Sequence, residues 1–362
     1  MQTTTAISVI PGVPESLERI EVVVPEPGPM EVLVDGIRCG ICGTDREIIE
    51  GHIGLPPENQ QHLVLGHEVL GRVHAVGSGV TDLRPGELVT ATVRRPDGCP
   101  SCQAGQPDMC QWQQYTEHGI KGRNGFLAGQ FITERPYVIP VDAHLEETGV
   151  LIEPLTVVEK AVRQAMLIQR RMAVWEPRTA IVAGAGPIGI LGTLLLRSIG
   201  LEVYTVARTP APNIHSDVVT RAGAHYVSTG EETIAALAQR LGNVDIILES
   251  TGASMVAFEA MTALGINGVL VLLSVTDTAT MMEVSTGGIN NGLVGGNKVV
   301  VGSVNSGIED FEAAVVRLDR FGQLWPGLAA SIITHRIPFN GDLSGVLHEP
   351  KDAIKVVIEF DL

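Results

Sequence analysis

The hydrophobic pattern of the chain changes character near residue 150. Before that point, hydrophobic and β-branched residues form short runs at 7–10, 19–24, 31–37, 68–77 and 87–93. Turns rich in proline and glycine separate these runs, as is typical of strands joined by tight connections. We therefore predict a compact antiparallel or barrel-like β domain, with one long cysteine-containing loop near residues 95–130.

After Gly149 the pattern predicts strands that alternate with helices. The segment 153–172 has hydrophobic residues at helical spacing and no glycine, which predicts a helix. Beyond it, strands are predicted at 179–183, 202–207, 225–227, 244–251, 268–275 and 298–304, with helices at 189–200, 216–223, 232–242 and 255–265. This alternation predicts a parallel sheet with right-handed crossovers. A helix at 308–322 and a short mixed tail end the chain.

Length and composition narrow the class of protein. A chain of 362 residues suggests two domains, and 44% hydrophobic with 18% charged residues argues for large cores. The formal charge of −16 disfavours nucleic acid as the main partner, because phosphate binding needs a basic surface. No basic run is suited to hold an anionic membrane.

The N-terminal segment has no basic residue before Arg19, whereas a secretory signal needs an early basic region. We therefore expect a cytoplasmic protein. The uncharged segment 179–196 contains glycines and Pro187, which favour a strand–turn–helix over a membrane-spanning helix. The five cysteines, at 39, 42, 99, 102 and 110, indicate metal or thiol chemistry rather than disulfides.

A glycine motif predicts a dinucleotide site. Gly184, Gly186 and Gly189 follow a hydrophobic strand and open a hydrophobic helix through Pro187 and Ile188. That context turns a weak motif into a specific one, because the glycines let the backbone approach a pyrophosphate at the helix N-terminus. The alternative is a glycine-rich turn between packed elements.

The end of the second strand discriminates between cofactors. An NAD site usually has a carboxylate there for the ribose hydroxyls. This chain has Ala207, Arg208 and Thr209 instead, and the guanidinium of Arg208 is suited to pair with a 2′-phosphate. We predict a preference for NADP, with NAD as the weaker substrate; the alternative is that Arg208 is only a solvated loop charge.

One thiol, one imidazole and two carboxylates predict a catalytic zinc site. Cys42 and Thr44 share a loop, His67 and Glu68 follow at the start of a strand, and Glu153 opens the long helix. Such ligands make a mixed tetrahedral site with an open position, which polarises a hydroxyl as alcohol oxidation requires. Taken singly, each residue has another reading: a buried cysteine, a core histidine or a charge at a helix N-terminus.

A second cysteine group has the spacing of a structural zinc lobe. Cys99, Cys102 and Cys110 form C-x2-C-x7-C in a loop rich in Pro, Gly and Asp. A structural zinc needs four ligands, and Asp97 is the candidate for the fourth. The alternative is that the metal has been lost and the thiols are free.

The order of these motifs resembles the zinc-dependent medium-chain alcohol dehydrogenases over essentially the full length. Those motifs are GICGTD, GHE, the cysteine lobe, EPL and GAGPIG. The stretches CGTDREIIEG, YTEHGIKGRNGF, LIEPLTVVEKA and NKVVVGSVNS are similar to the glucose dehydrogenase branch, of the archaeal or halophile type. The resemblance implies an α/β fold: a GroES-like β-rich catalytic domain at 1–177 and 305–362, and a Rossmann domain with a doubly wound parallel sheet at 178–304.

The resemblance also implies residue roles. Cys42, His67, Glu68 and Glu153 match the catalytic zinc ligands, and Thr44 matches the hydroxyl that relays the proton. Glu117 and Asn305 match sugar contacts, together with Thr44 and Glu153. The cofactor contacts that it implies are Arg208 at the 2′-phosphate and Ser274, Val275, Val304 and Asn305 near the nicotinamide.

Three positions depart from the family pattern. Pro96 stands where the first cysteine of the lobe is usual, which puts the structural zinc in question. Val157 replaces an acidic sugar contact, so the sugar preference is open. Glu47 stands where liver-type enzymes have a proton-relay histidine, so the proton exit route is open.

The sequence thus predicts a zinc enzyme that transfers hydride from C1 of D-glucose, or of a related aldose, to NADP and forms the aldonolactone. The alternatives are an NAD(P)-dependent polyol or secondary-alcohol dehydrogenase and, in another class, a non-catalytic dinucleotide-binding protein. A homodimer or homotetramer is expected from the resemblance.

Overall fold

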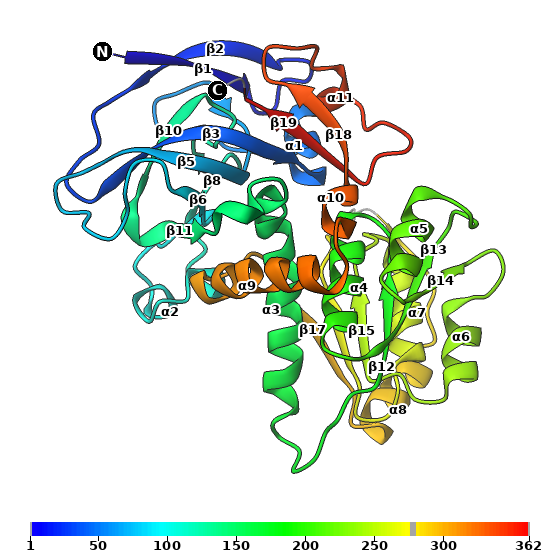
Figure 1. The fold of residues 1–362 in the computed structure, drawn as a ribbon. Helices are drawn as coiled ribbons and strands as arrows, with labels where there is room; N and C mark the ends of the chain where they lie inside the picture. Colours follow the sequence, from blue (N-terminus) through cyan, green and yellow to red (C-terminus); the bar gives the residue numbers. More distant parts are fainter. Residues whose placement is uncertain (1, 276–279, 361–362) are drawn as a thin grey trace. The chain divides into compact units, whose positions relative to one another are not determined.

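The computed structural model describes residues 2–275 and 280–360. It divides into two compact units, drawn in Figure 1. Unit 1 comprises Met1–Glu153, Asn305–Asp319 and Ile333–Leu362, and unit 2 comprises Pro154–Val304 and Arg320–Ile332. The expected domain boundaries, with the first domain running to residue 177, stay a prediction.

The described strands of unit 1 form three β-sheets. The largest has the order β11-β6-β5-β3-β19-β18, with β10 also paired to β3; the other two are β2-β1-β4 and β7-β8-β9. The strands are β1 (Gln2–Val9), β2 (Glu18–Val24), β3 (Glu31–Ile41), β4 (Leu63–Val64), β5 (Glu68–Val76), β6 (Leu88–Ala91), β7 (Arg94–Arg95), β8 (Thr116–His118), β9 (Gly122–Arg123), β10 (Gln130–Glu134), β11 (Val138–Val141), β18 (Ile333–Pro338) and β19 (Lys355–Glu359).

Short helices connect these strands. They are α1 (Gly43–Ile49), α2 (Pro100–Gln103), α11 (Ser344–Leu347) and the 3-10 turns η1 (Pro107–Met109), η2 (Arg135–Tyr137), η3 (Ala143–Leu145) and η4 (Gly149–Leu151). Two longer helices, α3 (Ile152–Gln169) and α9 (Ile308–Leu324), each contribute residues to both units.

The C-terminal tail completes the large sheet of unit 1. β19 pairs antiparallel with β3, with Val356 opposite Ile41, and β18 pairs parallel with β19. β19 is buried at four of its five positions, so its hydrophobic residues join the core beneath β3. Residues from opposite ends of the chain therefore lie on neighbouring strands.

Unit 2 contains the predicted parallel sheet. Its order, β14-β13-β12-β15-β16-β17, is that of the dinucleotide-binding fold. The strands are β12 (Thr179–Ala183), β13 (Glu202–Ala207), β14 (His225–Ser228), β15 (Ile246–Glu249), β16 (Val269–Leu272) and β17 (Val299–Gly302). The helices are α4 (Pro187–Ser198), α5 (Ile214–Arg221), α6 (Ile234–Leu241), α7 (Ser254–Ala263), α8 (Thr286–Gly295) and α10 (Leu328–Ile332). The predicted α/β class and the Rossmann order of the parallel sheet are confirmed.

Some details differ from the predicted pattern. Helix α8 was not predicted, because its sequence, TGGINNGLVG, is rich in glycine and therefore has low helix propensity. The predicted helix 153–172 ends at Gln169. The strand predicted at 87–93 ends at Ala91, and Thr92 donates its N–H to the carbonyl of Tyr137 instead.

Each unit has its own hydrophobic core. In unit 2 the core contains residues of β12, β13 and β15 packed with helices α6 and α7.

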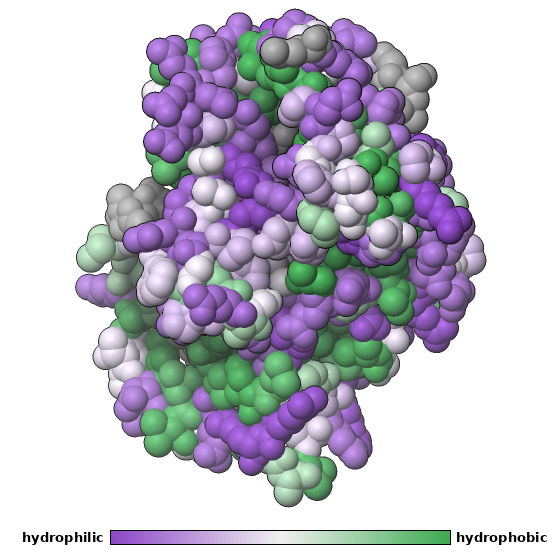
Figure 2. Space-filling view, turned by 90° about the vertical axis from the view of Figure 1, so that its left-hand side faces the viewer, coloured by the Kyte–Doolittle hydropathy of each residue, from purple (hydrophilic) through white to green (hydrophobic). Residues whose placement is uncertain are grey.

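Figure 2 shows a face on which hydrophilic residues predominate, with hydrophobic residues gathered toward the bottom of the view. Within the described residues, no helix is long and apolar enough to cross a membrane.

Candidate active site

The N-terminus of helix α1 carries the first part of the candidate metal site. Cys42 is the N-cap of α1, and Asp45 closes a capping box by accepting the N–H of Cys42 at 2.9 Å. His67, just before β5, places its Nε2 3.1 Å from Sγ of Cys42. The ligand atoms of Cys42, Asp45 and His67 lie within 4.8 Å of one another.

Asp45 faces the imidazole of His67. Its Oδ1 lies 3.5 Å from Nδ1 of His67, and the carboxylate is fully buried. A carboxylate on the far nitrogen of a histidine ligand fixes the tautomer and the ring orientation. Asp45 belongs to the GICGTD motif, but no role was predicted for it; its spacing from Cys42, which matches a capping box, is the signal that the sequence carries.

Buried charges in this cluster change the pKa values of its members. Burial alone lowers the pKa of His67, but the charges of Cys42 and Asp45 outweigh it and raise that pKa well above its ordinary value. The pKa of Asp45 is lowered, because the imidazolium of His67 and the N–H of Cys42 outweigh burial. The buried negative charges of this cluster thus favour a positive charge beside them.

Two further carboxylates lie beside the same imidazole. One ligand atom each of His67, Glu68 and Glu153 falls within 4.8 Å. Glu68 begins β5 and is ion-paired with Lys355, whereas Glu153 lies in the first turn of α3. Burial, the largest cause, raises the pKa of Glu153 to about 7. Sulfur, nitrogen and oxygen ligands in one buried place fit zinc better than calcium or magnesium.

The predicted zinc ligands thus form two groups that share the imidazole of His67: Cys42 belongs to one, and Glu68 and Glu153 belong to the other. Thr44 is half-buried in the first turn of α1, two residues beyond Cys42. Glu47 is exposed on the same helix. Lys355 was missed by the sequence reasoning, since nothing in the tail marks it as a partner of Glu68.

Glu117 and Asn305 form a second polar cluster in unit 1. Oε1 of Glu117 accepts a hydrogen bond from Nδ2 of Asn305 at 2.8 Å and one from Nε of Arg94 at 3.0 Å. The side chain of Glu117 is 11% exposed and that of Arg94 is 4% exposed. The two predicted sugar contacts are thus in direct contact, and Glu117 is a buried, ion-paired carboxylate.

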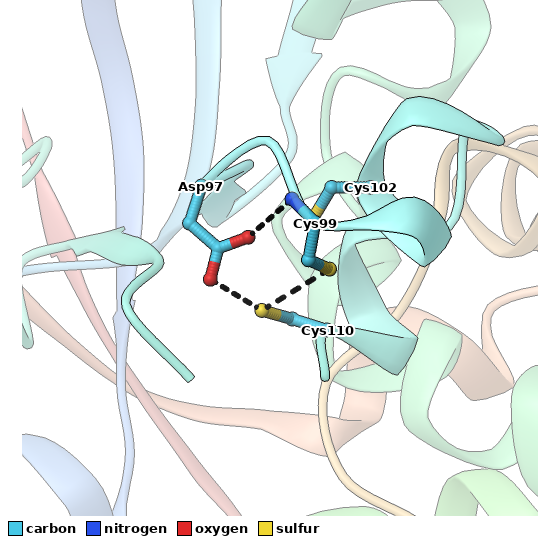
Figure 3. Close-up of side chains that lie close together, drawn as sticks. All are labelled: Asp97, Cys99, Cys102 and Cys110. Atoms are coloured by element: carbon cyan, nitrogen blue, oxygen red, sulfur yellow. Dashed lines mark hydrogen bonds between the residues drawn. The ribbon is translucent and has the colours of Figure 1, made fainter. Parts of the chain in front are cut away.

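The cysteine lobe, defined here as residues 97–110, gathers all four of its candidate ligands (Figure 3). Oδ2 of Asp97 lies 2.8 Å from Sγ of Cys110, and Sγ of Cys110 lies 3.8 Å from Sγ of Cys99. The ligand atoms of Asp97, Cys99, Cys102 and Cys110 fall within 4.8 Å of one another. Pro96 is exposed and precedes Asp97 directly.

Backbone donors already point at the sulfur atoms of the lobe. The N–H groups of Gln111 and Gln113 donate to Sγ of Cys99 and Cys110, each at 3.3 Å. Burial, the largest cause, raises the pKa of Cys102 to about 12. A thiolate at Cys102 would therefore need a nearby cation. A zinc ion held by the four candidate ligands would supply that cation.

The glycine turn of unit 2 joins β12 to helix α4. Gly184 has φ +110°, a conformation that favours glycine. Gly186 is the N-cap of α4, and an added Cβ there meets nothing within 4 Å. At Gly189, an added Cβ falls 2.0 Å from the carbonyl oxygen of Gly184. Gly186 thus leaves open space at the helix N-terminus, Pro187 and Ile188 open the helix, and Gly189 lets the turn close.

The other predicted cofactor residues end the strands of unit 2. Ala207 ends β13, and the exposed Arg208 and Thr209 follow it. Ser274 and the exposed Val275 follow β16, and Val304 follows β17. The carbonyl of Val304 accepts a hydrogen bond from the buried Lys160 at 2.9 Å. All of them lie at or just beyond the carboxyl ends of parallel strands, where ligands bind in this fold.

Two family models match the chain. The Glucose dehydrogenase C-terminus model matches residues 146–360, and the Alcohol dehydrogenase GroES-like domain model matches residues 28–143. Among curated proteins, glucose 1-dehydrogenase of Methanocella arvoryzae is 41% identical and covers 98% of this chain and 99% of its own. Glucose 1-dehydrogenase of Haloarcula marismortui is 34% identical over 96% of both chains.

Solved structures show the same similarity. A mutant of glucose dehydrogenase from Haloferax mediterranei superposes with a TM-score of 0.90 at 34% identity, over 99% of both chains. The enzyme from the same organism in complex with NADP, Zn and gluconolactone has a TM-score of 0.87 at 32% identity, also over 99% of both chains.

Proposed function

Because the chain belongs to the glucose dehydrogenase family of the zinc-dependent medium-chain alcohol dehydrogenases, we propose that it oxidises C1 of D-glucose, or of a related aldose, with NADP. The product is the aldonolactone. The observation that carries the proposal is the buried cluster of thiol, imidazole and carboxylates in a chain 41% identical to a glucose 1-dehydrogenase. A protein that only binds a dinucleotide has no need of such a cluster.

Cys42, His67, Glu68 and Glu153 would hold the catalytic zinc in this proposal. Bound zinc supplies a Lewis acid that polarises the reacting hydroxyl and lowers its pKa. Asp45 orients His67 through the contact between Oδ1 and Nδ1. Thr44 accepts the proton of the sugar hydroxyl at its own hydroxyl and passes it on, since it lies in the same turn as the thiol ligand.

Glu117 and Asn305 would bind sugar hydroxyls, with Thr44 and Glu153 beside the reacting carbon. Their mutual hydrogen bond holds a carboxylate and an amide in one place, and a sugar needs such fixed polar partners. An unmatched hydroxyl would leave a buried carboxylate unpaired, which gives selectivity. Val157, half-buried on α3, takes the place of a further acidic contact, so we propose an aldose preference that differs in detail from that of relatives with the acid.

Bound NADP supplies the hydride acceptor. We propose that Gly184, Gly186 and Gly189 cradle its pyrophosphate, with the N-terminus of α4 directed at the charge. Arg208, next to Ala207 and Thr209, would pair with the 2′-phosphate, so NAD is the weaker substrate. Ser274, Val275, Val304 and Asn305 would contact the nicotinamide. The relative crystallised with NADP, Zn and gluconolactone supports this choice of cofactor.

Asp97, Cys99, Cys102 and Cys110 would hold a second, structural zinc. The support is the convergence of the four ligand atoms and the backbone donors directed at two of the sulfurs. We further propose a homodimer or homotetramer in the cytoplasm. Support for that location comes from the cysteines, because four of the five lie in two candidate metal clusters and none of the five forms a disulfide.

The test is the initial rate of NADPH formation from NADP with D-glucose, run beside galactose, xylose, sorbitol and a simple alcohol. We expect an aldose to be oxidised fastest, with loss of activity in a chelator and recovery with added zinc. Oxidation of sorbitol or simple alcohols alone would reject the sugar and leave a polyol or secondary-alcohol dehydrogenase. Bound zinc and NADP without any turnover would favour the non-catalytic class.

A further inference from the structure

Arg94 is a buried cation that no motif in the sequence singles out. It lies on β7 directly opposite Glu117 on β8. Its Nε donates to Oε1 of Glu117 at 3.0 Å, and its Nη2 is ion-paired with the same oxygen at 2.9 Å. The guanidinium also stacks on the ring of Tyr115, 3.6 Å from the centroid. The stacking on Tyr115 and the pairing of β7 with β8 together fix the orientation of the Arg94 side chain.

The two oxygens of the Glu117 carboxylate differ in their contacts. Its side-chain contacts with described residues, a hydrogen bond and an ion pair from Arg94 and a hydrogen bond from Asn305, all end on Oε1. Oε2 therefore remains to accept a hydrogen bond from a ligand, in a carboxylate that its partners hold in one rotamer. A buried acceptor whose position is set in advance is worth more to binding than a mobile one.

The other side of the guanidinium contacts the cysteine lobe. Nη1 of Arg94 reaches the carbonyls of Pro107 and Asp108, at 3.4 Å each, in the turn that leads into Cys110. A Cβ added at Gly307 would fall 3.1 Å from Oδ1 of Asp108, so the backbone that follows Asn305 packs on the same turn. The lobe thus supports both members of the Glu117–Asn305 pair.

We propose that Arg94 is a positioning residue for sugar binding, which ties the cysteine lobe to Glu117 and leaves Oε2 of that carboxylate directed at a substrate hydroxyl. The inference rests on the proposed function and adds to it the residue that holds the sugar contact. It concerns selectivity among sugars and not hydride transfer itself. The expected signature is therefore a change in KM for the sugar and in discrimination between sugars.

Arg94→Lys is the first variant, since lysine keeps the charge but cannot bridge Glu117 and two carbonyls at once. We expect KM for glucose to rise roughly 10- to 100-fold, the range for weakening a hydrogen bond to a charged group, with KM for NADP nearly unchanged. We also expect a fall in the ratio of kcat/KM for glucose to kcat/KM for those of its epimers and deoxy analogues that the enzyme oxidises. Arg95→Lys is the matched control, because Arg95 is the next residue on β7, equally buried, and paired with Glu134 instead.

The double variant Glu117→Gln/Arg94→Lys separates positioning from general damage. If Arg94 acts through Glu117, adding Arg94→Lys to Glu117→Gln should change KM for the sugar little further. Tyr115→Leu is a milder second probe: it removes the stacking partner while the ion pair remains, and we expect a smaller rise in KM for the sugar. It keeps the test available if Arg94→Lys does not fold.

The outcomes separate two failures. If the unaltered protein oxidises no aldose, the proposed function fails and this inference fails with it. A different result would overturn only the inference. In that case the unaltered protein oxidises glucose, and Arg94→Lys or Tyr115→Leu lowers the melting temperature as Arg95→Lys does. KM for the sugar and the kcat/KM ratios between sugars then stay unchanged. A rise in KM for the sugar that disappears in the Glu117→Gln background supports it.

Discussion

The ammonium of Lys355 on β19 is ion-paired with the carboxylate of Glu68 on β5, and the two side chains are 1% and 2% exposed. Nζ of Lys355 also donates to the carbonyl of Ile41 at 3.1 Å, on the strand between them. Burial alone lowers the pKa of Lys355, but Glu68 and the other negative charges outweigh it and raise that pKa. The C-terminal strand thus supplies the counter-charge of a candidate zinc ligand.

Replacing Lys355 by Met should destabilise the protein strongly. Breaking a buried pair leaves one charge unpaired and typically costs about 3–5 kcal/mol. The measurement is urea unfolding with a chelator present, so that bound metal does not mask the change. Lys351→Met, at an exposed position four residues away, is the control. Adding Glu68→Gln should restore part of the loss, and an equal effect of the two lysine variants would contradict the role of the pair.

Gly186 and Gly189 should respond differently to a single methyl group. A Cβ at Gly189 falls 2.0 Å from the carbonyl oxygen of Gly184, so Gly189→Ala must displace backbone and destabilise unit 2. A Cβ at Gly186 meets nothing within 4 Å and φ there is −73°, so the fold should tolerate Gly186→Ala. The methyl then fills space needed by the pyrophosphate. Thermal melts and NADP titrations should separate the two variants; equal NADP affinity in Gly186→Ala and the wild type would remove Gly186 from the cofactor site.

Arg208→Ala should distinguish NADP from NAD. We expect KM for NADP to rise about 10-fold or more, from the loss of a charge-assisted contact, while KM for NAD changes little. Initial rates with both cofactors at saturating glucose measure this. Arg221→Ala, which removes an exposed arginine paired with Asp217 on α5, is the control. An equal rise for both cofactors would show that Arg208 does not bind the 2′-phosphate.

The sequence predicted what local motifs encode. Gly184, Gly186 and Gly189 occupy the turn expected of them, because tight turns require particular residues at fixed spacing. The cluster of Cys42 and His67 was likewise readable from ligand type and order. Lys355 and Arg94 were not, since their roles depend on which strands become neighbours. Val356 lies opposite Ile41 and Arg94 opposite Glu117 only after the sheets form, and no spacing in the sequence encodes those pairings.

Metal analysis should find about two zinc ions per chain if both sites bind metal, and about one if the lobe has lost its metal. Asp97→Ala should lower a content of two to one, because it removes an oxygen ligand within 2.8 Å of Sγ of Cys110. Asp142→Ala, at an exposed carboxylate outside either cluster, should leave the content unchanged. A content of two in Asp97→Ala would exclude Asp97 as a ligand.

His118 should make stability depend on pH below neutrality. Burial, the largest cause, and the charges of Arg95 and Arg123 hold the pKa of His118 well below its ordinary value. Its Nδ1 lies 2.7 Å from the carbonyl oxygen of Asn124, and its ring stacks on Phe126, so it stays neutral in the fold. The unfolded chain takes up this proton as the pH falls through about 6.5, whereas the folded chain does not, so stability is lost on the acid side.

His118→Gln keeps a donor for the Asn124 carbonyl and removes this titration. The free energy of unfolding, measured in urea from pH 7.5 down to 5, should then fall less steeply than in the wild type, by up to about 1.4 kcal/mol per pH unit for one proton. His52→Gln, which alters a surface histidine beside Glu50, is the control. Parallel pH profiles for the wild type and His118→Gln would mean that His118 takes up its proton in the folded state as readily as in the unfolded chain.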